Sequence, residues 1–215
     1  MKNIFRTAPE FYILYIIFLI VSSALLLIYG KAAVEIWCNS HNSALLDKFF
    51  AVYTNVGDGL FATVVCLAFL FYRMGYGVML AISNIAAGFL AQFLKRVVFY
   101  DAVRPRVYFS GIYDLHFAEG VDVLSANSMP SGHTATAFAT FLCLAIFTKN
   151  SFLRILFFFL ALLVGYSRMY LSQHFLTDVF VGSIVGVAVV IAYYLYHQKI
   201  QAPWHHKPLL ALFKK

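Results

Sequence analysis

Three short polar stretches of this 215-residue chain contain the side chains that acid–base and nucleophilic chemistry uses. They read LKRVVFYDAVRPR at 94–106, SMPSGH at 128–133 and SRMYLSQHFLTD at 167–178, and each lies beside a long apolar run. Ionisable groups next to such runs are costly, and they mark a functional site by default. Each stretch is therefore examined for the chemistry that its residue types support.

The third stretch contains a histidine and an aspartate in helical register. His174 and Asp178 are four residues apart, so on a helix they share one face. The carboxylate can then accept a hydrogen bond from one imidazole nitrogen, which fixes the tautomer and leaves the other nitrogen free as a base or nucleophile. An interfacial histidine in an ordinary helix-pair bond has the same spacing, and taken alone the pair favours that structural role.

The second stretch has the composition of a helix start that faces an anion. A helix beginning near Ser131 offers unpaired backbone N–H groups and the positive end of its dipole. Gly132 lets a ligand approach the backbone, and Pro130 is tolerated where its missing N–H would be unpaired anyway. His133 would lie in the first turn, close to the anion. In isolation the motif fits a simple loop-to-helix cap equally well.

The elements that must position these residues are membrane helices, judging by composition. The chain is 62% hydrophobic and 12% charged, whereas a soluble domain is about half apolar and a quarter charged. Its formal net charge of +7 comes from basic residues between apolar runs, which favours topology-setting charges over nucleic-acid binding. Cys38, Cys66 and Cys143 lack the spacing of a disulfide framework or a CxxC metal site, so we interpret them as packing residues.

Six apolar segments approach the roughly 20 residues that cross a bilayer. They predict an all-α, integral membrane six-transmembrane-helix bundle, with 1–215 as a single membrane domain. We expect a motif-bearing core at about 75–196 and a basic cytoplasmic tail at 197–215. The first run is expected to stay as a helix rather than to be removed as a signal peptide. The segments are about 11–30, 56–72, 76–94, 133–148, 152–167 and 175–196.

Six spans place both termini on one side of the membrane. That side holds nine lysines and arginines against seven on the other, and chemistry would occupy several of the seven, so we expect cytoplasmic termini. The connections at 95–132 and 168–174 then open on the same extracytoplasmic face. Residues 31–59 are too polar to span and aromatic enough to lie along the interface. The nine residues are Lys2, Arg6, Arg73, Lys149, Arg154, Lys199, Lys207, Lys214 and Lys215.

This topology adds Lys95, Arg104 and Arg168 to the two histidines. Each could be a snorkelling or topology-setting charge, which is the interpretation we prefer for Arg96 and Arg106. Two imidazoles, one carboxylate, several cations and a helix start instead suit a multiply charged anion, phosphate above all. A metal site would need more carboxylates or thiolates beside the histidines. In such a pocket one histidine attacks phosphorus, the other protonates the leaving alkoxide and the cations stabilise the equatorial oxygens.

PSGH at 130–133 and SR-x5-H-x3-D at 167–178 resemble motifs two and three of the type 2 phosphatidic acid phosphatase (PAP2) superfamily, which includes vanadium haloperoxidases. The resemblance covers about 75–195, and the six-span plan extends it over the chain. It implies that His174 is the nucleophile and becomes phosphohistidine, with Asp178 orienting it and His133 as general acid. It implies no metal and no other cofactor. The implied phosphate ligands are Lys95, Arg104, Ser131, Gly132 and Arg168.

One motif departs from the family pattern, and two acidic residues fall outside it. The family's first motif has six residues between Lys and Arg-Pro, whereas eight separate Lys95 from Arg104 and seven separate Arg96 from Arg104. Either the loop bulges by two residues and Lys95 still reaches the phosphate, or another cation serves. Asp58 and Glu119 lie on the same face and could recognise a hydroxyl or amine on a head group. Turn chemistry for Asp58 and solvation for Glu119 are the favoured interpretations.

The sequence thus predicts a lipid phosphatase of the cell inner membrane with a periplasmic active site, acting on a membrane lipid within the phospholipid bilayer. Lipid A, undecaprenyl diphosphate and phosphatidylglycerol phosphate are the candidate substrates, and the first two are preferred. An anion-binding transporter would carry its polar groups in broken helices near mid-span. A metal-dependent intramembrane hydrolase would use His133, His174 and Asp178 as ligands. Nothing in the sequence fixes an oligomeric state.

Overall fold

The regular elements of this chain are helices, as an apolar sequence in lipid requires. The computed structural model describes residues 4–197 and 206–212, and no strand occurs within them. A backbone inside a bilayer finds no water, so it satisfies its N–H and C=O groups within the helix. The elements are η1 (Ile4–Arg6), α1 (Pro9–Ser40), α2 (Ala44–Tyr53), η2 (Thr54–Gly57), α3 (Gly59–Tyr72), α4 (Met74–Phe93), η3 (Leu94–Val98), α5 (Pro105–Tyr108), α6 (Gly132–Phe147), α7 (Ser151–Tyr170), α8 (Leu176–His197) and η5 (Leu209–Leu212).

Four helices of the described chain are long and apolar enough to cross a membrane: α1, α4 with the turn η3, α7 and α8. The segment from α2 through η2 forms, with α3, a pair bent by 53° that passes the same test as one broken span. α6 is apolar but has 16 residues, about 24 Å of helix against a hydrocarbon core of about 30 Å. The predicted all-α membrane fold is confirmed, whereas the count of six spans stays a prediction because α3 and α6 are short.

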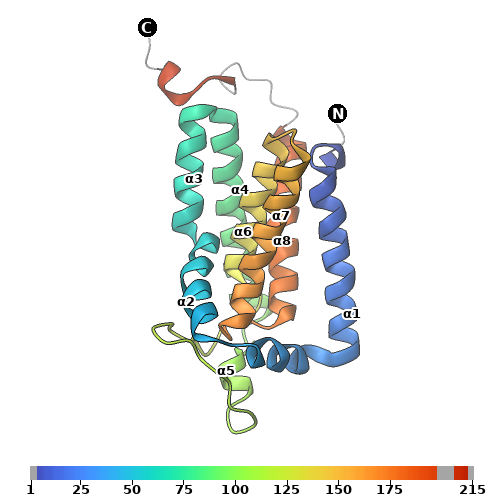
Figure 1. The fold of residues 1–215 in the computed structure, drawn as a ribbon. Helices are drawn as coiled ribbons and strands as arrows, with labels where there is room; N and C mark the ends of the chain where they lie inside the picture. Colours follow the sequence, from blue (N-terminus) through green and yellow to red (C-terminus); the bar gives the residue numbers. More distant parts are fainter. Residues whose placement is uncertain (1–3, 198–205, 213–215) are drawn as a thin grey trace.

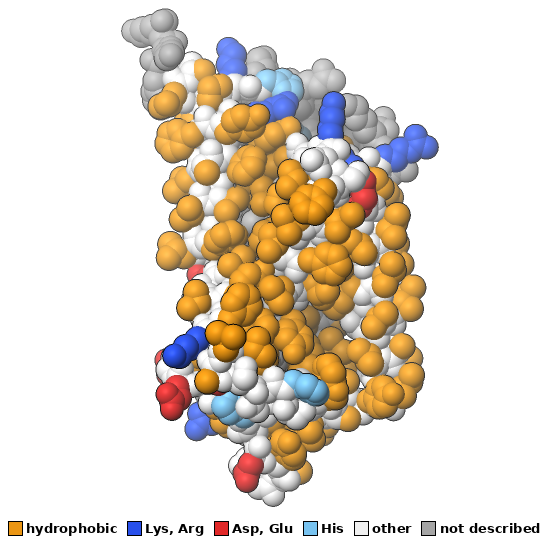
Figure 2. Space-filling model, viewed as in Figure 1, with side chains coloured by type: hydrophobic (Ala, Val, Ile, Leu, Met, Phe, Trp, Pro, Cys, Tyr) orange, Lys and Arg blue, Asp and Glu red, His pale blue; other side chains and the backbone are white. Residues whose placement is uncertain are grey.

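The outer surface is that of a multi-pass membrane protein. Figure 2 shows hydrophobic side chains over the middle of the visible face, with Lys, Arg, Asp and Glu near its two ends. Leu27, Ile85 and Phe89 are among the large apolar side chains that lie fully outside the core. An apolar surface this extensive would drive association in water, but acyl chains cover it in a bilayer.

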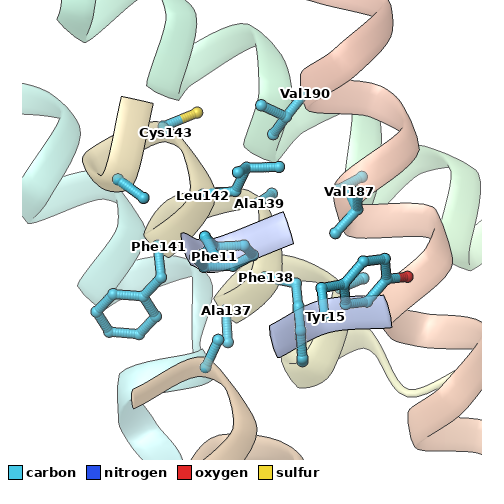
Figure 3. Packing of buried hydrophobic residues seen from close by; sticks show 14 of the residues in the cluster. Phe11, Tyr15, Ala137, Phe138, Ala139, Phe141, Leu142, Cys143, Val187 and Val190 are labelled. Carbon is cyan, nitrogen blue, oxygen red and sulfur yellow. The ribbon is translucent and has the colours of Figure 1, made fainter. Parts of the chain in front are cut away.

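The core is built around α6, which packs against α4, α7 and α8. Phe11 of α1 meets the ring of Phe158 edge-on, with centroids 5.5 Å apart, and Phe138 of α6 lies in the same cluster (Figure 3). Cys38, Cys66 and Cys143 are free and buried. This agrees with the packing role expected for them.

Two glycines of α8 let that helix touch the backbone of α6. A Cβ on Gly182 would lie 2.5 Å from the carbonyl oxygen of Ser131, and a Cβ on Gly186 would strike the carbonyl oxygen of Ala135. Small residues at helix contacts in lipid permit this close approach. The contact joins the start of α6, which holds His133, to the first turns of α8, which hold Asp178.

The two ends of the bundle differ in structure (Figure 1). One end holds η1, η5, the α3–α4 turn and the short α6–α7 connection, so the first and last described elements lie at the same end of the bundle, as an even number of spans requires. The other end carries α2, α5 and the connection at 99–131. There α1 is broken at Gly30, with φ of 73°, and its remainder runs across the end of the bundle, as expected for the first part of 31–59. The rest of that segment differs from the expectation, because α2 and η2 run along the bundle and form with α3 the bent pair described above (Figure 1).

Part of the predicted topology cannot be placed on this fold. The predicted tail at 197–215 is described at His197 and at 206–212. Four of the lysines and arginines counted for the termini lie outside the described residues: Lys2, Lys199, Lys214 and Lys215.

Candidate active site

The residues singled out in the three motifs lie at the end of the bundle that carries α2 and α5. They come from the end of α4 and η3, the connection before α5, the start of α6, the end of α7 and the α7–α8 connection. Most are buried, with exposed fractions of 8% or less, while Gly132 and His133 are partly exposed. The buried ones are Lys95, Arg104, Ser131, Arg168, His174 and Asp178.

His174 lies in the tight connection 171–175, and its ring is fixed by Asp178. The imidazole Nδ1 is 3.3 Å from Oδ2 of Asp178, and the same oxygen accepts hydrogen bonds from the backbone N–H of Phe175 at 3.1 Å and from the hydroxyl of Ser128. A carboxylate held this way cannot swing away from the ring, so Nε2 is directed elsewhere. Burial lowers the pKa of His174 to about 3, and the ring is therefore neutral at neutral pH.

The second motif forms the helix start that its sequence predicted. α6 begins at Gly132 with Ser131 as its N-cap, and the Ser131 hydroxyl accepts from the backbone N–H of Thr134 at 3.4 Å. The backbone N–H of Ser131 donates to the carbonyl oxygen of Asp178 at 2.9 Å, which ties this cap to α8. Helix geometry leaves the first-turn N–H groups without intrahelical acceptors. Apart from its chain neighbours and the backbone of its own helix, no described atom lies within 4 Å of a Cβ built on Gly132, so the backbone there is open to a ligand.

Two guanidinium groups enter this site without a carboxylate partner among the described residues. Arg168 donates from Nη1 to the hydroxyl of Thr54 at 2.6 Å, and within the described chain its buried Nε has no acceptor. Arg104 donates from Nε to the carbonyl oxygen of Ala126 at 2.9 Å and from Nη1 to the backbone and side-chain oxygens of Gln173. Burial lowers the pKa of Arg104, as expected for a cation removed from water.

The eight-residue spacing between Lys95 and Arg104 is accommodated by a wide helical turn. η3 is a π-helical segment in which the N–H of Phe99 donates to the carbonyl of Leu94, five residues back, at 2.8 Å. π-turns occur mostly as single insertions at functional sites. Lys95 is 8% exposed and lines a pocket of about 370 Å³ together with Arg104 and Arg96. The π-turn lies between Lys95 and Arg104, and both residues line the same pocket. That Lys95 reaches the phosphate stays a prediction.

The charges of this site act on one another across several elements. Lys95 interacts electrostatically with Arg104, Arg168 and Asp178. His174 interacts with the same two arginines. Lys95 and Arg104 thus interact with one buried aspartate, Asp178, and Arg168 adds a third buried cation that acts on His174. The surplus positive charge suits a multiply charged anion.

Asp58 has the turn role expected for it, while Glu119 is exposed as expected for a solvated residue. Oδ1 of Asp58 caps α3 by accepting from the N–H of Leu60 at 2.8 Å. Arg106 donates to the carbonyl oxygen of Val123 at the surface, and Arg96 is exposed at the rim of the pocket.

Several residues at this site were missed in the sequence. Ser128 and Gln173 lie within SMPSGH and SRMYLSQHFLTD, so a polar residue in the same stretch as a candidate histidine is a usable signal. Thr54 and Glu35 had no such signal in the sequence. Thr54 reaches the site through the turn at η2, and Glu35 reaches it through the break of α1 at Gly30. Glu35 is fully buried, lies beside Ser172 and interacts electrostatically with Asp178.

Fold and site together define a helical membrane protein with a cationic, histidine-containing site at one end of its bundle. Residues 73–202 match the model of the PAP2 superfamily. The match covers more than half of the chain, and the chain belongs to that superfamily.

Similar proteins include lipid phosphatases. A lipid A 1-phosphatase of Porphyromonas gingivalis is 39% identical over 73 residues, which is 32% of this chain but 16% of that relative's length. The crystal structure of Aquifex aeolicus LpxE superposes with a TM-score of 0.67 at 27% identity, covering 76% of this chain and 93% of that one. A transmembrane PAP2 type phosphatidylglycerolphosphate phosphatase of Bacillus subtilis shares the fold, with a TM-score of 0.64 at 24% identity over 90% of this chain and 98% of that one.

Proposed function

We propose that this protein is a membrane lipid phosphatase that hydrolyses a phosphomonoester or diphosphate through a phosphohistidine intermediate. One observation carries the proposal: a neutral imidazole held by Asp178 lies among Lys95, Arg104 and Arg168, which have no carboxylate partner in the described chain. A nucleophile of this kind beside unneutralised cations suits attack on a phosphate group. Membership in the PAP2 superfamily supports the same activity.

The proposed reaction has two steps. First, Nε2 of His174 forms a bond to phosphorus as the P–O bond to the lipid breaks, and the departing oxygen keeps the bonding electron pair and takes a proton from His133. The cations and the N–H groups at the start of α6 bind the equatorial oxygens. Water then attacks the phosphohistidine, His133 removes its proton, and phosphate leaves with His174 restored.

We propose that the reaction uses no metal ion. The three cations of the site supply the charge neutralisation that a metal provides in other phosphatases. Within residues 4–197 and 206–212, no group of three or more His, Cys, Asp or Glu side chains is arranged to hold a metal. Full turnover in excess chelator is the expected result, and loss of activity that a divalent cation restores would contradict this part of the proposal.

Lipid A is the first substrate to test, followed by undecaprenyl diphosphate. The named activity of the Porphyromonas gingivalis relative supports lipid A. The apolar surface around the bundle and the position of the site at its end support a substrate that stays in the leaflet while its phosphate enters. Phosphatidylglycerol phosphate is the third candidate.

A panel of these three lipids in mixed micelles, assayed with purified protein by release of free phosphate, tests the activity. Turnover of at least one lipid by the wild type and none by His174→Ala is expected. Asp178→Asn should retain little activity, because the ring loses the acceptor that orients it. A wild type that releases phosphate from no member of the panel, or a His174→Ala protein as active as the wild type, contradicts the proposal.

We further propose an inner-membrane location with the site facing the periplasm. The excess of basic residues on the termini's side supports it. The three native cysteines are buried, so a single added cysteine reports its own side. Glu119→Cys at the site end should react with an impermeant maleimide in intact spheroplasts, whereas Lys149→Cys at the opposite end should react only after lysis. The reverse pattern would contradict the orientation.

A further inference from the structure

Asp58 has a second contact besides its cap of α3. Oδ2 of Asp58 lies 3.9 Å from Nε2 of His133, while Oδ1 accepts the hydrogen bond from Leu60. The two oxygens therefore serve different partners. We propose that Asp58 is a positioning residue that favours the protonated form of His133, from which the leaving group takes its proton, an inference that rests on the proposed lipid phosphatase activity.

The backbone beside Asp58 is shaped for close approach to His133. A Cβ on Gly57 would lie 2.8 Å from the carbonyl oxygen of His133, 3.0 Å from its Cβ and 2.5 Å from a methyl carbon of Val164. Only glycine lets η2 pack this tightly against the first turn of α6. Asp58 is the next residue in the chain. The close packing of Gly57 against the backbone of His133 therefore also places the Asp58 carboxylate near the His133 imidazole.

The electrostatic surroundings of His133 explain why a carboxylate is needed there. Burial acts most strongly against a positive charge on the ring, and Arg168, Lys95 and Arg104 add to that effect, whereas Asp58 opposes it. A general acid must hold a proton before the ester bond breaks. Asp58 is half exposed at the mouth of an anion site, where its charge opposes phosphate binding. Stabilising the imidazolium gives that unfavourable charge a function.

The groups that face the His133 ring come from four elements. They are Arg168 at the end of α7, Lys95 in η3, Arg104 before α5 and Asp58 at the start of α3.

The proton balance of the first step identifies a selective test. With an alkyl phosphate the leaving oxygen becomes an alcohol, so it requires the proton of His133. With p-nitrophenyl phosphate the leaving group departs as a stable phenolate and needs no proton. The value of kcat/KM includes only the steps up to the first released product, so hydrolysis of the phosphohistidine, common to both substrates, drops out.

Asp58→Asn is the variant to measure, because asparagine still caps a helix but carries no charge. On an octyl phosphate substrate its kcat/KM at pH 8 should fall about 10-fold, and the basic limb of the pH profile should move down by about one pH unit. On p-nitrophenyl phosphate the change should stay below about 2-fold. Asp58→Ser, which also caps, should behave alike, and Asp58→Glu should restore part of the loss. Glu119→Gln removes an exposed carboxylate from the same end and should match the wild type.

Every outcome decides the matter. Equal losses on both substrates, including complete inactivity, would assign Asp58 a structural role and overturn the inference, as would unchanged kcat/KM and an unmoved basic limb for octyl phosphate. These results leave the proposed function standing as long as the wild type turns over a lipid phosphate. A wild type inactive on every phosphate ester overturns both proposals together.

Discussion

The two arginines of α7 lie at opposite ends of one helix and serve different purposes. Arg154, in the first turn, donates to the Glu10 carboxylate at 3.1 Å and from Nε and Nη2 to the carbonyl oxygen of Thr148 at 3.1 and 2.9 Å. Its positive charge is neutralised and its donors are used. It joins α1 to α7 at the end of the bundle away from the histidines.

Arg168, in the last turn, is more deeply buried yet less satisfied. It has the hydroxyl of Thr54, and its Nε has no acceptor among the residues that the structure describes. A buried cation left this way is costly unless something else binds it. The comparison indicates that incomplete hydrogen bonding of a buried guanidinium, rather than residue type, distinguishes the proposed ligand-binding end of this helix from the structural end.

The largest effect should come from removing the nucleophile that Arg168 accompanies. His174→Ala should lower kcat on the active lipid on the order of 10⁴-fold or more, because no other described group replaces the attacking nitrogen. The assay is phosphate release at saturating lipid, with the thermal midpoint as the folding control. A loss below about 10-fold would place the chemistry elsewhere and remove the basis of the contrast.

Arg168→Gln should have the second largest effect. Loss of a cation that binds the equatorial oxygens should reduce kcat/KM by about 100- to 1,000-fold. Vanadate, which resembles the phosphate, should inhibit the wild type competitively and raise its thermal midpoint, whereas the variant should lose most of that stabilisation. If vanadate stabilised both proteins equally, Arg168 would not be a ligand.

The pH dependence of stability should show that His174 is buried as a neutral ring. Because its folded-state pKa lies below the unfolded value of about 6.5, the folded protein binds fewer protons between the two values. The contribution is complete above about pH 6.5 and is lost as the pH falls toward 3, at up to about 1.4 kcal/mol per pH unit. Thermal midpoints of the wild type should therefore fall more steeply on acidification than those of His174→Gln. Parallel curves would contradict a neutral buried ring.

Arg154→Gln should have the smallest effect on catalysis. Its ion pair with Glu10 is partly exposed, so its loss should cost at most about 1 kcal/mol of stability, seen as a modest drop in thermal midpoint. The kcat/KM should stay within about 2-fold of the wild type. An activity loss comparable to that of Arg168→Gln would erase the distinction between the two ends of α7.

The sequence predicted the parts of the site that lie within contiguous motifs. Helical spacing paired His174 with Asp178, although His174 lies just before the first residue of α8. The composition of SMPSGH predicted a helix start near Ser131, and α6 begins at Gly132. The all-helical membrane fold followed from the length of the apolar runs alone. These features depend on residues that are close together in the chain, so residue spacing and local composition are enough to predict them.

What the sequence could not supply depends on contacts between distant segments. Thr54 beside Arg168 and Asp58 beside His133 require the bend between α2 and α3, which no local pattern specifies. The spacing of Lys95 left two possibilities open because a π-turn differs from an α-turn by one hydrogen-bond step, which composition does not encode. The count of six spans stays a prediction, because α6 is shorter than the length that crosses a bilayer.

The glycine contacts between α6 and α8 have a consequence for anyone who screens for inactive mutants. Gly186→Ala adds one methyl group about two helical turns from Asp178. That methyl group would clash with the carbonyl oxygen of Ala135 and push α8 away from α6. The connection 171–175, which holds His174, would then move with α8. Position 186 lies outside the three motifs, so motif comparison alone would not identify Gly186→Ala as a harmful substitution. Substitutions that abolish activity should therefore occur at Gly182 and Gly186 of α8 as well as at the charged residues of the candidate site.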